Sequence, residues 1–456
     1  MMSAITNTDT ICAPATAAGG ALGIIRVSGP QAFNAVSALC SVSCDSAAAN
    51  TVHYTHLVTP PLVGGGRGEA LDEALLTIFR APHSYTGEDS VEISCHGSRY
   101  IINKVLELLI QQGCRMANPG EFTQRAYLNG KLDLSQAEAV ADLIASTNQA
   151  THRLAMSQLR GGISTELSRL REQLLKLTSL LELELDFSDH EDLEFADRPE
   201  LLELAQRIDA HITRLANSFH AGNALKNGIP VAIVGAPNVG KSTLLNALLG
   251  EERAIVSDIQ GTTRDAIEDT IQLGGITFRF IDTAGIRHTD DQIELMGIDR
   301  SIAAAQRARI ILMMTAPGVS YPDIPIRDDQ TVITVCNKSD LDCLTPVRPD
   351  AAVTSPIPIS AKFGIGLDEL RQQLLDAAPK ASDDDIIVTN ARHYEALTRA
   401  HSHLQRVLAG LQNDLSGDLL SEDLRLTLDT LAEITGGQIT PNEVLANIFK
   451  NFCVGK

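Results

Sequence analysis

The spacing of apolar residues divides the chain into strand-like and helix-like stretches. Short apolar runs at residues 21–27, 71–79 and 91–94 have the length and composition of strands. Residues 98–112 carry apolar side chains at helical spacing, namely Ile101, Ile102, Val105, Leu108 and Leu109. Strands alternating with a helix predict an α/β domain over residues 1–126.

Residues 127–227 have a helical pattern. Residues 135–138 read Ser-Gln-Ala-Glu, a capping-box sequence, and predict the start of a long helix that runs to Leu159. Gly161 and Gly162 interrupt the pattern. Further helices are predicted over 165–185 and 199–219, joined by an acidic, solvated connector at 186–197 and followed by a linker at 220–228.

Residues 228–380 return to alternating strands and helices. Apolar runs at 229–234, 278–281 and 332–336 predict strands, and 242–249 predicts a helix. Gly274-Gly275, between two β-rich runs, predicts a hairpin turn and therefore an antiparallel edge strand.

The remaining residues, 381–456, are again helical in pattern. Helices are predicted over 390–411, 421–434 and 441–452, the last with a capping box at Thr440 and Glu443 and with Pro441 at the first helical position. We therefore expect a multidomain chain in which 127–227 and 381–456 form one all-α domain and the α/β domain at 228–380 is inserted between its helices.

The inserted region carries a phosphate-binding loop. Residues 235–242 fit G-x-x-x-x-G-K-S, between a predicted strand and a predicted helix, which is the context that a P-loop requires. The glycines let backbone N–H groups converge on phosphate oxygens beside a helix N-terminus. Lys241 is expected to reach the β- and γ-phosphates, and the Ser242 hydroxyl to ligate Mg²⁺.

Four more motifs follow in a fixed order, at 261–265, 282–285, 337–340 and 360–362. Asp340 can accept hydrogen bonds from N1–H and the amine of guanine, which adenine does not offer in that place. Each motif alone is ordinary turn chemistry, whereas five in order predict GTP binding. The predicted GTP-binding residues are Asn238, Val239, Gly240, Lys241, Ser242, Thr243, Ser257, Asp258, Ile259, Gly261, Thr262, Thr263, Asp282, Thr283, Ala284, Gly285, Asn337, Lys338, Asp340, Ser360, Ala361 and Lys362.

Composition narrows the range of partners. The net charge is −20, from 37 Lys+Arg and 57 Asp+Glu, and aromatic residues are only 4% with no Trp, so the chain lacks the general footprint of a nucleic-acid binder. The eight cysteines include no C-x-x-C pair, which favours reduced thiols. No apolar run reaches transmembrane length, so we expect a cytoplasmic protein without a membrane partner.

Taken together, the motifs resemble those of the bacterial tRNA-modification GTPases of the MnmE (TrmE) family, from end to end. Besides the five motifs above, the resemblance is carried by residues 9–11, 26–29, 84–89, 119–126, 129–134 and a C-terminal C-x-G-K at 453–456. The chain has Ala-Ala-Gly-Gly at 17–20, without the arginine that the family usually has there. The resemblance implies a folate-binding, dimer-forming N-terminal domain, a helical domain and an inserted Ras-like P-loop GTPase domain (G-domain).

The resemblance also implies an activity and its partners. Members act as homodimers with the flavoprotein MnmG (GidA), in a heterotetramer, on tRNA. They add an aminomethyl or carboxymethylaminomethyl group at C5 of the wobble uridine, U34, with a one-carbon unit from 5,10-methylenetetrahydrofolate or 5-formyltetrahydrofolate. GTP, Mg²⁺ and K⁺ are the other implied ligands.

By motif position, the resemblance assigns further site residues. Folate contacts fall on Arg26, Glu92, Lys131 and Lys456, and the catalytic residues on Glu294, as the group that orients water, and Cys453. Potassium falls on Asn238, Ser257, Ile259 and Thr262, and magnesium on Ser242 and Thr263. Ile286 stands where Ras-like proteins place the glutamine that orients water, so another group has to do so.

Two other functions remain open from sequence. One is a ribosome-assembly GTPase similar to Era-type proteins, which the net charge and the lack of a basic, aromatic RNA-binding appendage disfavour. The other is a folate-dependent one-carbon transferase that its G-domain merely regulates.

Overall fold

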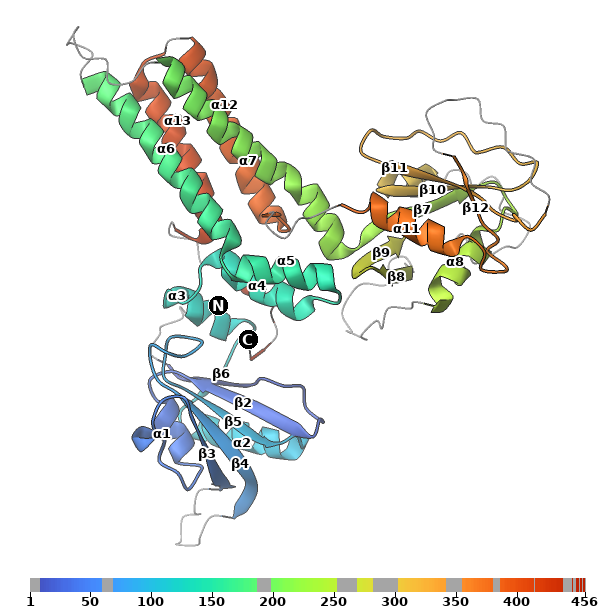
Figure 1. Cartoon of the computed structure of the whole chain (residues 1–456). Helices are drawn as coiled ribbons and strands as arrows, with labels where there is room; N and C mark the ends of the chain where they lie inside the picture. Colours follow the sequence, from blue (N-terminus) through green and yellow to red (C-terminus); the bar gives the residue numbers. More distant parts are fainter. Residues whose placement is uncertain are drawn as a thin grey trace. The chain divides into compact units, whose positions relative to one another are not determined.

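The computed structural model describes residues 9–59, 69–186, 198–251, 269–281, 302–341, 355–379, 386–413 and 415–437, with residues 445, 448–450, 452, 454 and 455 near the C-terminus (Figure 1). The chain divides into two compact units. The first comprises Met1–Ile144, Gln158–Lys176 and Leu424–Lys456, and the second comprises Ala145–Ser157 and Leu177–Asp423. No helix within the described ranges is both long enough and apolar enough to cross a membrane.

The first unit contains a six-stranded sheet in the order β3-β4-β5-β2-β1-β6. Its strands are β1 (Ile11–Pro14), β2 (Leu22–Ser28), β3 (Thr51–Val58), β4 (Ala70–Phe79), β5 (Ser90–His96) and β6 (Arg115–Met116). Strands β1 and β6 are parallel and the other neighbours antiparallel. The predicted strands at 21–27, 71–79 and 91–94 are confirmed as β2, β4 and β5, whereas β1, β3 and β6 were not predicted.

One face of this sheet is covered by α1 (Ala32–Ser37) and α2 (Arg99–Gln111), with the short 3₁₀ turn η1 (Cys44–Ser46) beside α1. Ile25 and Val27 of β2 and Ile93 of β5 are fully buried in the core on that side. Side chains alternate along a strand. Arg26 and Glu92 therefore lie on the opposite face.

Helices α3 (Glu121–Leu128) and α4 (Leu134–Ala145) hold the C-terminal residues. Leu134 and Ala137 of α4 form a small core with Leu445, Phe449 and Phe452. Much of the predicted helix 441–452 lies outside the described residues, yet these contacts hold the C-terminal residues inside the first unit.

The second unit contains a long antiparallel helix pair, α7 (Arg198–Asn227) and α12 (Ala391–Gln412). Asp209 accepts a 2.7 Å hydrogen bond from His401 Nδ1, and the Phe219 ring stacks on Tyr394 with 4.6 Å between ring centroids. Asn390 caps α12 through its side chain, which accepts from Arg392 N, so the helix predicted to start at 390 begins at Ala391. Helices α5 (Gln149–Leu159), α6 (Gly162–Asp186) and α13 (Gly417–Thr435) have residues in both units.

The second sheet has the order β12-β11-β10-β7-β9-β8. Its elements are β7 (Ile229–Gly235), α8 (Lys241–Glu251), β8 (Asp269–Leu273), β9 (Ile276–Phe280), β10 (Ile310–Thr315), β11 (Thr331–Cys336), β12 (Ile357–Pro358) and α11 (Leu367–Ala377). All neighbours are parallel except β8 and β9, which form the predicted edge hairpin. Every residue of β10 is buried, because apolar cores lie on both faces of the sheet.

Two predictions about helix ends were wrong. The predicted linker at 220–228 is helical as far as Asn227, because Ala224 and Leu225 are buried against the core of the second sheet. The predicted cap at Ser135 lies inside α4. Asp133 is the capping residue instead, since its Oδ1 accepts from Gln136 N at 2.9 Å and Gln136 Oε1 accepts from Asp133 N at 2.9 Å.

The helix predicted to run unbroken to Leu159 is two helices, α4 and α5. The break lies at 146–148, where Asn148 Oδ1 accepts from Thr151 N at 2.8 Å and caps the start of α5. A hydrogen bond from an Asn side chain to nearby backbone competes with the backbone hydrogen bonds of a helix. The spacing of apolar residues gives no sign of this competition, so the break was not predicted.

Candidate functional site

The P-loop joins the end of β7 to the start of α8, as predicted. Asn238 and Gly240 have positive φ, at 61° and 95°. A Cβ on Gly240 would lie 2.3 Å from Asn337 Nδ2, so only glycine fits there. The loop is thus folded back on itself at the N-terminus of an 11-residue helix, an arrangement suited to phosphate.

Lys241 is folded onto this loop. Its Nζ donates to Gly235 O at 2.8 Å and to Ala236 O at 2.9 Å. Burial lowers the pKa of Lys241. A phosphate oxygen in the loop would offer this partly buried ammonium a charged acceptor, which makes a stronger hydrogen bond than a carbonyl does.

Asn337 joins the phosphate loop to the predicted base-binding residues. It is almost fully buried at the end of β11, where Nδ2 donates to Val239 O at 2.8 Å and Oδ1 accepts from Ala361 N at 3.0 Å. The predicted motifs at 235–242, 337–340 and 360–362 are therefore brought together at the carboxyl end of parallel strands, where open α/β sheets bind ligands.

Asp340 is exposed and oriented by Ser360, whose Oγ donates to Asp340 Oδ1 at 2.6 Å. This hydrogen bond lowers the pKa of Asp340, with smaller contributions from Lys362 and Lys338. The carboxylate therefore stays an acceptor at neutral pH, as recognition of guanine requires.

Many of the predicted residues lie outside the described parts of the chain. They are Ser257, Asp258, Ile259, Gly261, Thr262, Thr263, Asp282, Thr283, Ala284, Gly285, Glu294, Cys453 and Lys456. Among the predicted cation ligands, the structure places Asn238, which is exposed in the P-loop, and Ser242 at the start of α8.

The first unit brings two predicted folate residues into contact. Arg26 and Glu92 are register partners on β2 and β5, and Arg26 donates to Glu92 Oε1 from Nε at 2.9 Å and from Nη2 at 2.8 Å. Arg26 Nη1 also donates to Gly455 O at 3.3 Å, so the C-terminal segment reaches this pair. The Arg26 and Glu92 side chains remain 18% and 25% exposed, which leaves the pair accessible to a ligand.

Tyr85 lies beside Arg26, and Lys131 bonds to the segment that precedes Tyr85. Lys131 Nζ donates to Pro82 O at 3.0 Å. The Tyr85 ring centroid lies 5.4 Å from Arg26 Cζ, within cation–π range. Burial raises the pKa of Tyr85, so its hydroxyl stays neutral. An aromatic ring, a guanidinium, a carboxylate and an ammonium can together recognise a flat heterocycle that carries carboxylates.

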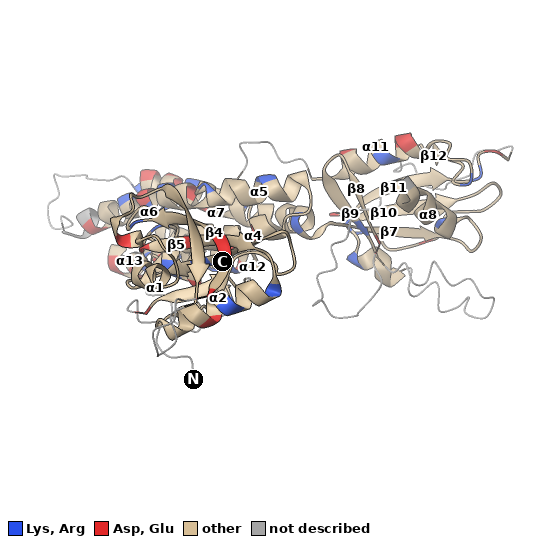
Figure 2. Cartoon of the chain, turned by 90° about the horizontal axis from the view of Figure 1, so that it is seen from below, with Lys and Arg blue, Asp and Glu red and all other residues tan. Residues whose placement is uncertain are grey.

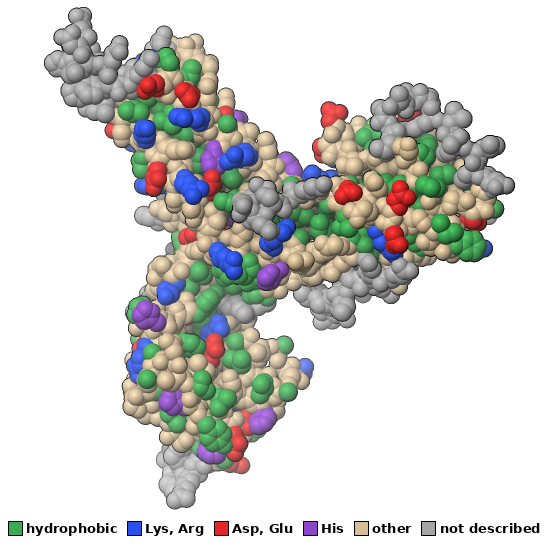
Figure 3. Space-filling view, viewed as in Figure 1, with side chains coloured by type: hydrophobic (Ala, Val, Ile, Leu, Met, Phe, Trp, Pro, Cys, Tyr) green, Lys and Arg blue, Asp and Glu red, His purple; other side chains and the backbone are tan. Residues whose placement is uncertain are grey.

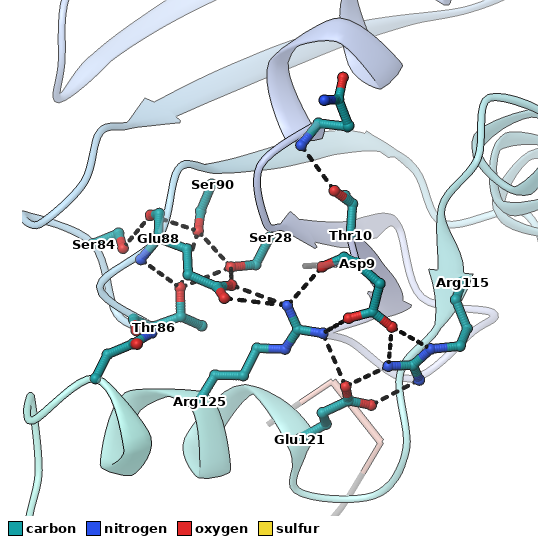
Figure 4. A network of polar contacts seen from close by, with 12 residues as sticks. Asp9, Thr10, Ser28, Ser84, Thr86, Glu88, Ser90, Arg115, Glu121 and Arg125 are labelled. Carbon is teal, nitrogen blue, oxygen red and sulfur yellow. Dashed lines mark hydrogen bonds and ion pairs between the residues drawn. The ribbon is translucent and has the colours of Figure 1, made fainter. Parts of the chain in front are cut away.

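A buried ionic network beside this cluster was not predicted (Figure 4). Arg125 is fully buried and bonds Asp9 Oδ1 at 2.7 Å, Glu121 Oε1 at 3.1 Å and Glu88 at 3.2 Å. Arg115 bonds Asp9 and Glu121 at 2.8 and 2.6 Å. The only sequence signal is the i, i+4 spacing of Glu121 and Arg125.

The network shifts the titration of its members. Burial raises the pKa of Asp9 and of Glu121, but hydrogen bonds and charges from Arg115 and Arg125 outweigh it, so both pKa values are lowered. The Glu121 hydrogen bond raises the pKa of Arg115. Because the three carboxylates come from three separate segments, the network fastens the N-terminal residues to α3.

Two family models match the chain, "GTP-binding protein TrmE N-terminus" over residues 10–131 and "MnmE helical domain" over residues 134–453. Among curated relatives, the tRNA modification GTPase MnmE of Bacteroides thetaiotaomicron is 53% identical, over 99% of this chain and 100% of its own. That of Phocaeicola vulgatus is 52% identical, over 99% of both chains. The solved G-domain of FeoB from Methanococcus jannaschii is similar to 33% of this chain and 97% of its own at 21% identity, with a TM-score of only 0.22.

Proposed function

Since this chain belongs to the MnmE family of tRNA modification GTPases, we propose that it is the GTP-hydrolysing subunit that modifies C5 of the wobble uridine, U34. The group added is aminomethyl or carboxymethylaminomethyl, with a one-carbon unit from a tetrahydrofolate. The observation that supports this most is the partly exposed Arg26–Glu92 pair, whose arginine contacts Gly455 of the C-terminal C-x-G-K.

For the nucleotide, we assign the phosphates to the P-loop and Lys241, and guanine to Asp340 with Asn337 as its support. Mg²⁺ is assigned to Ser242 and Thr263, and K⁺ to Asn238, Ser257, Ile259 and Thr262. The assignment is supported by the positive φ of Asn238 and Gly240, which folds the loop at the N-terminus of α8, where backbone N–H groups can bind phosphate. Glu294 is assigned the orientation of the attacking water.

For the folate, we assign Arg26, Glu92, Lys131 and Lys456 as contacts. Glu92 can accept hydrogen bonds from the amino edge of a pterin, and the lysines can pair with the glutamate tail. When bound, the folate supplies the one-carbon unit. The chain's own part is to orient the pterin and to hold the C-terminal segment, with Cys453, against it.

We further assign a homodimer formed through the N-terminal domain, a heterotetramer with the flavoprotein MnmG, and a cytoplasmic location. tRNA is assigned as the substrate from the family, since the net charge of −20 does not by itself favour nucleic acid. Figure 3 shows Lys and Arg side chains mixed with Asp and Glu on the helices, and on α7 the exposed Arg207 pairs with Glu203 at 3.8 Å. Helix α11 likewise carries both acidic and basic side chains (Figure 2).

The test is mass analysis of nucleosides in tRNA from a strain that lacks the protein. Loss of the C5 aminomethyl-type group at U34, restored by the wild-type chain but not by an Arg26→Ala chain, is the expected result. Intact U34 modification together with unprocessed ribosomal subunits would favour an assembly GTPase instead. If the Lys241→Ala chain fully restores U34 modification in that strain, the result would favour a one-carbon transferase that needs no GTP.

A further inference from the structure

The start of α5 is bonded to the β8–β9 hairpin of the G-domain, within the second unit. Asn148 Nδ2 donates to Thr277 Oγ1 of β9 at 2.7 Å. Gln272 Nε2 of β8 donates to Thr147 O at 2.9 Å, and Ala150 N donates to Gly275 O at 3.1 Å. Both strands of the hairpin and its turn are therefore held by one short segment, residues 147–150.

Asn148 can bond to the hairpin because its side-chain amide uses its oxygen to cap α5 and its nitrogen to reach β9. Its Oδ1 accepts from Thr151 N at 2.8 Å and caps α5, while its Nδ2 reaches Thr277. Thr151, which is buried, accepts from Asn148 N at 3.3 Å and completes a reciprocal cap. The donor that reaches the hairpin is thus held in place by the end of a helix.

Apolar and steric contacts fix the same junction. Gly275 has φ +77°, and a Cβ there would lie 3.0 Å from both Cβ and Oε1 of Gln149. Leu154, on the next turn of α5, packs against the core of the second sheet. The junction is therefore a packed contact that is sensitive to the position of the hairpin.

The hairpin lies in the sequence between two segments that contain predicted GTP-binding residues. Strand β9 pairs with β7, which leads into the P-loop, and Ile281 N donates to Val231 O at 3.0 Å. Asp282 follows Ile281 directly, and the segment that contains Thr262 and Thr263 precedes β8. The hairpin is therefore continuous in sequence with Thr262 and Thr263, assigned above to K⁺ and Mg²⁺, on one side and with Asp282, assigned to GTP, on the other.

We propose that Asn148 and Thr277 are positioning residues for GTP hydrolysis, which hold the hairpin in the placement that GTP favours over GDP. This rests on the nucleotide site proposed above. Binding linkage is reciprocal: if the γ-phosphate strengthens the Asn148–Thr277 contact, loss of the contact must weaken GTP binding relative to GDP by the same factor. A contact that serves stability alone would leave that ratio unchanged.

The test is Thr277→Val in the full-length protein, which keeps the β-branched shape and removes the acceptor. The ratio of affinities for a non-hydrolysable GTP analogue and for GDP should fall by about twofold or more, up to about tenfold if the whole hydrogen bond depends on the γ-phosphate, and kcat should fall with it. Thr270→Val is the matched control, because it makes the same change on β8. Within the described parts of the chain, the Thr270 side chain makes no hydrogen bond to residues 147–151. This variant should leave the ratio and kcat at wild-type values.

Asn148→Asp is the rescue variant. A carboxylate still caps α5 and can accept from the Thr277 hydroxyl, so the affinity ratio should stay near the wild-type value, while Asn148→Ala should lower it as Thr277→Val does. If Thr277→Val lowers the thermal midpoint but keeps the wild-type ratio and kcat, the proposal is overturned. A Lys241→Ala protein that binds GTP as tightly as wild type would instead overturn the nucleotide site itself.

Discussion

At the scale of single residues, we assign the choice of base to Asp340. Ser360 orients its carboxylate and lowers its pKa, so it presents acceptors at neutral pH. In Asp340→Asn, a donor replaces an acceptor opposite donors of guanine. We expect GTP affinity to fall by about ten- to hundredfold, because groups of guanine would be left unpaired, and xanthosine triphosphate to bind better than in wild type. Competition binding of the two nucleotides measures this.

Ser360→Ala is the control for that prediction, since it removes the hydroxyl that orients Asp340 and keeps the carboxylate. It should weaken GTP binding less than Asp340→Asn does and should leave xanthosine triphosphate disfavoured. Unchanged GTP affinity in Asp340→Asn would show that this residue does not recognise the base.

The buried network around Arg125 makes a second prediction at this scale. In Arg125→Met, the carboxylates of Asp9, Glu88 and Glu121 lose their shared partner (Figure 4). Removal of one partner from a buried ionic cluster costs about 3–5 kcal/mol. We expect the free energy of unfolding of the first unit to fall by that amount at pH 7, as measured by hydrogen exchange of the β1 and β2 amides. Arg115→Met, at a side chain that is 40% exposed, should cost less.

The pH dependence of this network follows from the direction of the shifts. The folded-state pKa values of Asp9 and Glu121 are lowered. Their contribution to stability is therefore complete above the ordinary carboxyl pKa of about 4 and is lost as the pH falls through the lowered values. Wild type and Arg125→Met should accordingly become more alike in stability below about pH 4. A stability difference that stays constant from pH 7 to pH 3 would contradict this account.

At the scale of elements, the C-terminal segment contacts strands β1 and β2 of the first sheet. Gly455 has φ +95°, and a Cβ there would lie 2.2 Å from Pro14 O of β1, while its carbonyl accepts from Arg26. Deletion of residues 453–456 should abolish tRNA modification and weaken folate binding, while GTP hydrolysis remains, because the nucleotide site is on a different sheet. The measurements are nucleoside mass analysis, folate titration and GTPase rate.

Cys453→Ser tests the thiol by itself, because it keeps the contacts that hold the C-terminal segment. If the thiol reacts, this variant should lose modification and keep folate affinity, because Gly455 and Lys456 remain. Full modification by the truncated chain would refute a functional C-terminal segment.

At the scale of the whole molecule, we expect hydrolysis to require potassium and a pair of G-domains in the homodimer. A cation held by Asn238 would stand where other GTPases place an arginine, an effect of ~10³–10⁵ in rate. Steady-state GTPase activity should therefore be high in potassium and low in sodium at equal ionic strength. Asn238→Ala should lose the stimulation, and Glu294→Ala should lose activity in both salts.

Dilution of the protein below the concentration at which G-domains pair should reduce the potassium-dependent rate per molecule. Equal rates in the two salts would refute the cation site. A fully active Glu294→Ala would remove that residue from the mechanism.

Much of this protein is determined by local sequence. The P-loop between a strand and a helix, the strands at 229–234, 278–281 and 332–336, and the hairpin turn at Gly274-Gly275 were predicted, and they lie as expected. Each depends on a few adjacent residues, through backbone conformation or an apolar period. The order of the five motifs predicted GTP binding, whereas the resemblance to the family also rested on residues at both ends of the chain, such as 119–126 and the C-x-G-K at 453–456.

Other features were decided only by the tertiary structure. The two-residue β6 is too short for any period, β3 has exposed Val52 and Tyr54 on its outer face, and the end of α7 depends on burial of Ala224 and Leu225. The same is true of contacts between distant segments: Arg125 with Asp9, Arg26 with Gly455, and Asn148 with Thr277. Strand register and burial bring these partners together, and neither can be derived from the residues on one side of the contact, because the free energy that favours each pairing comes from the whole core around it.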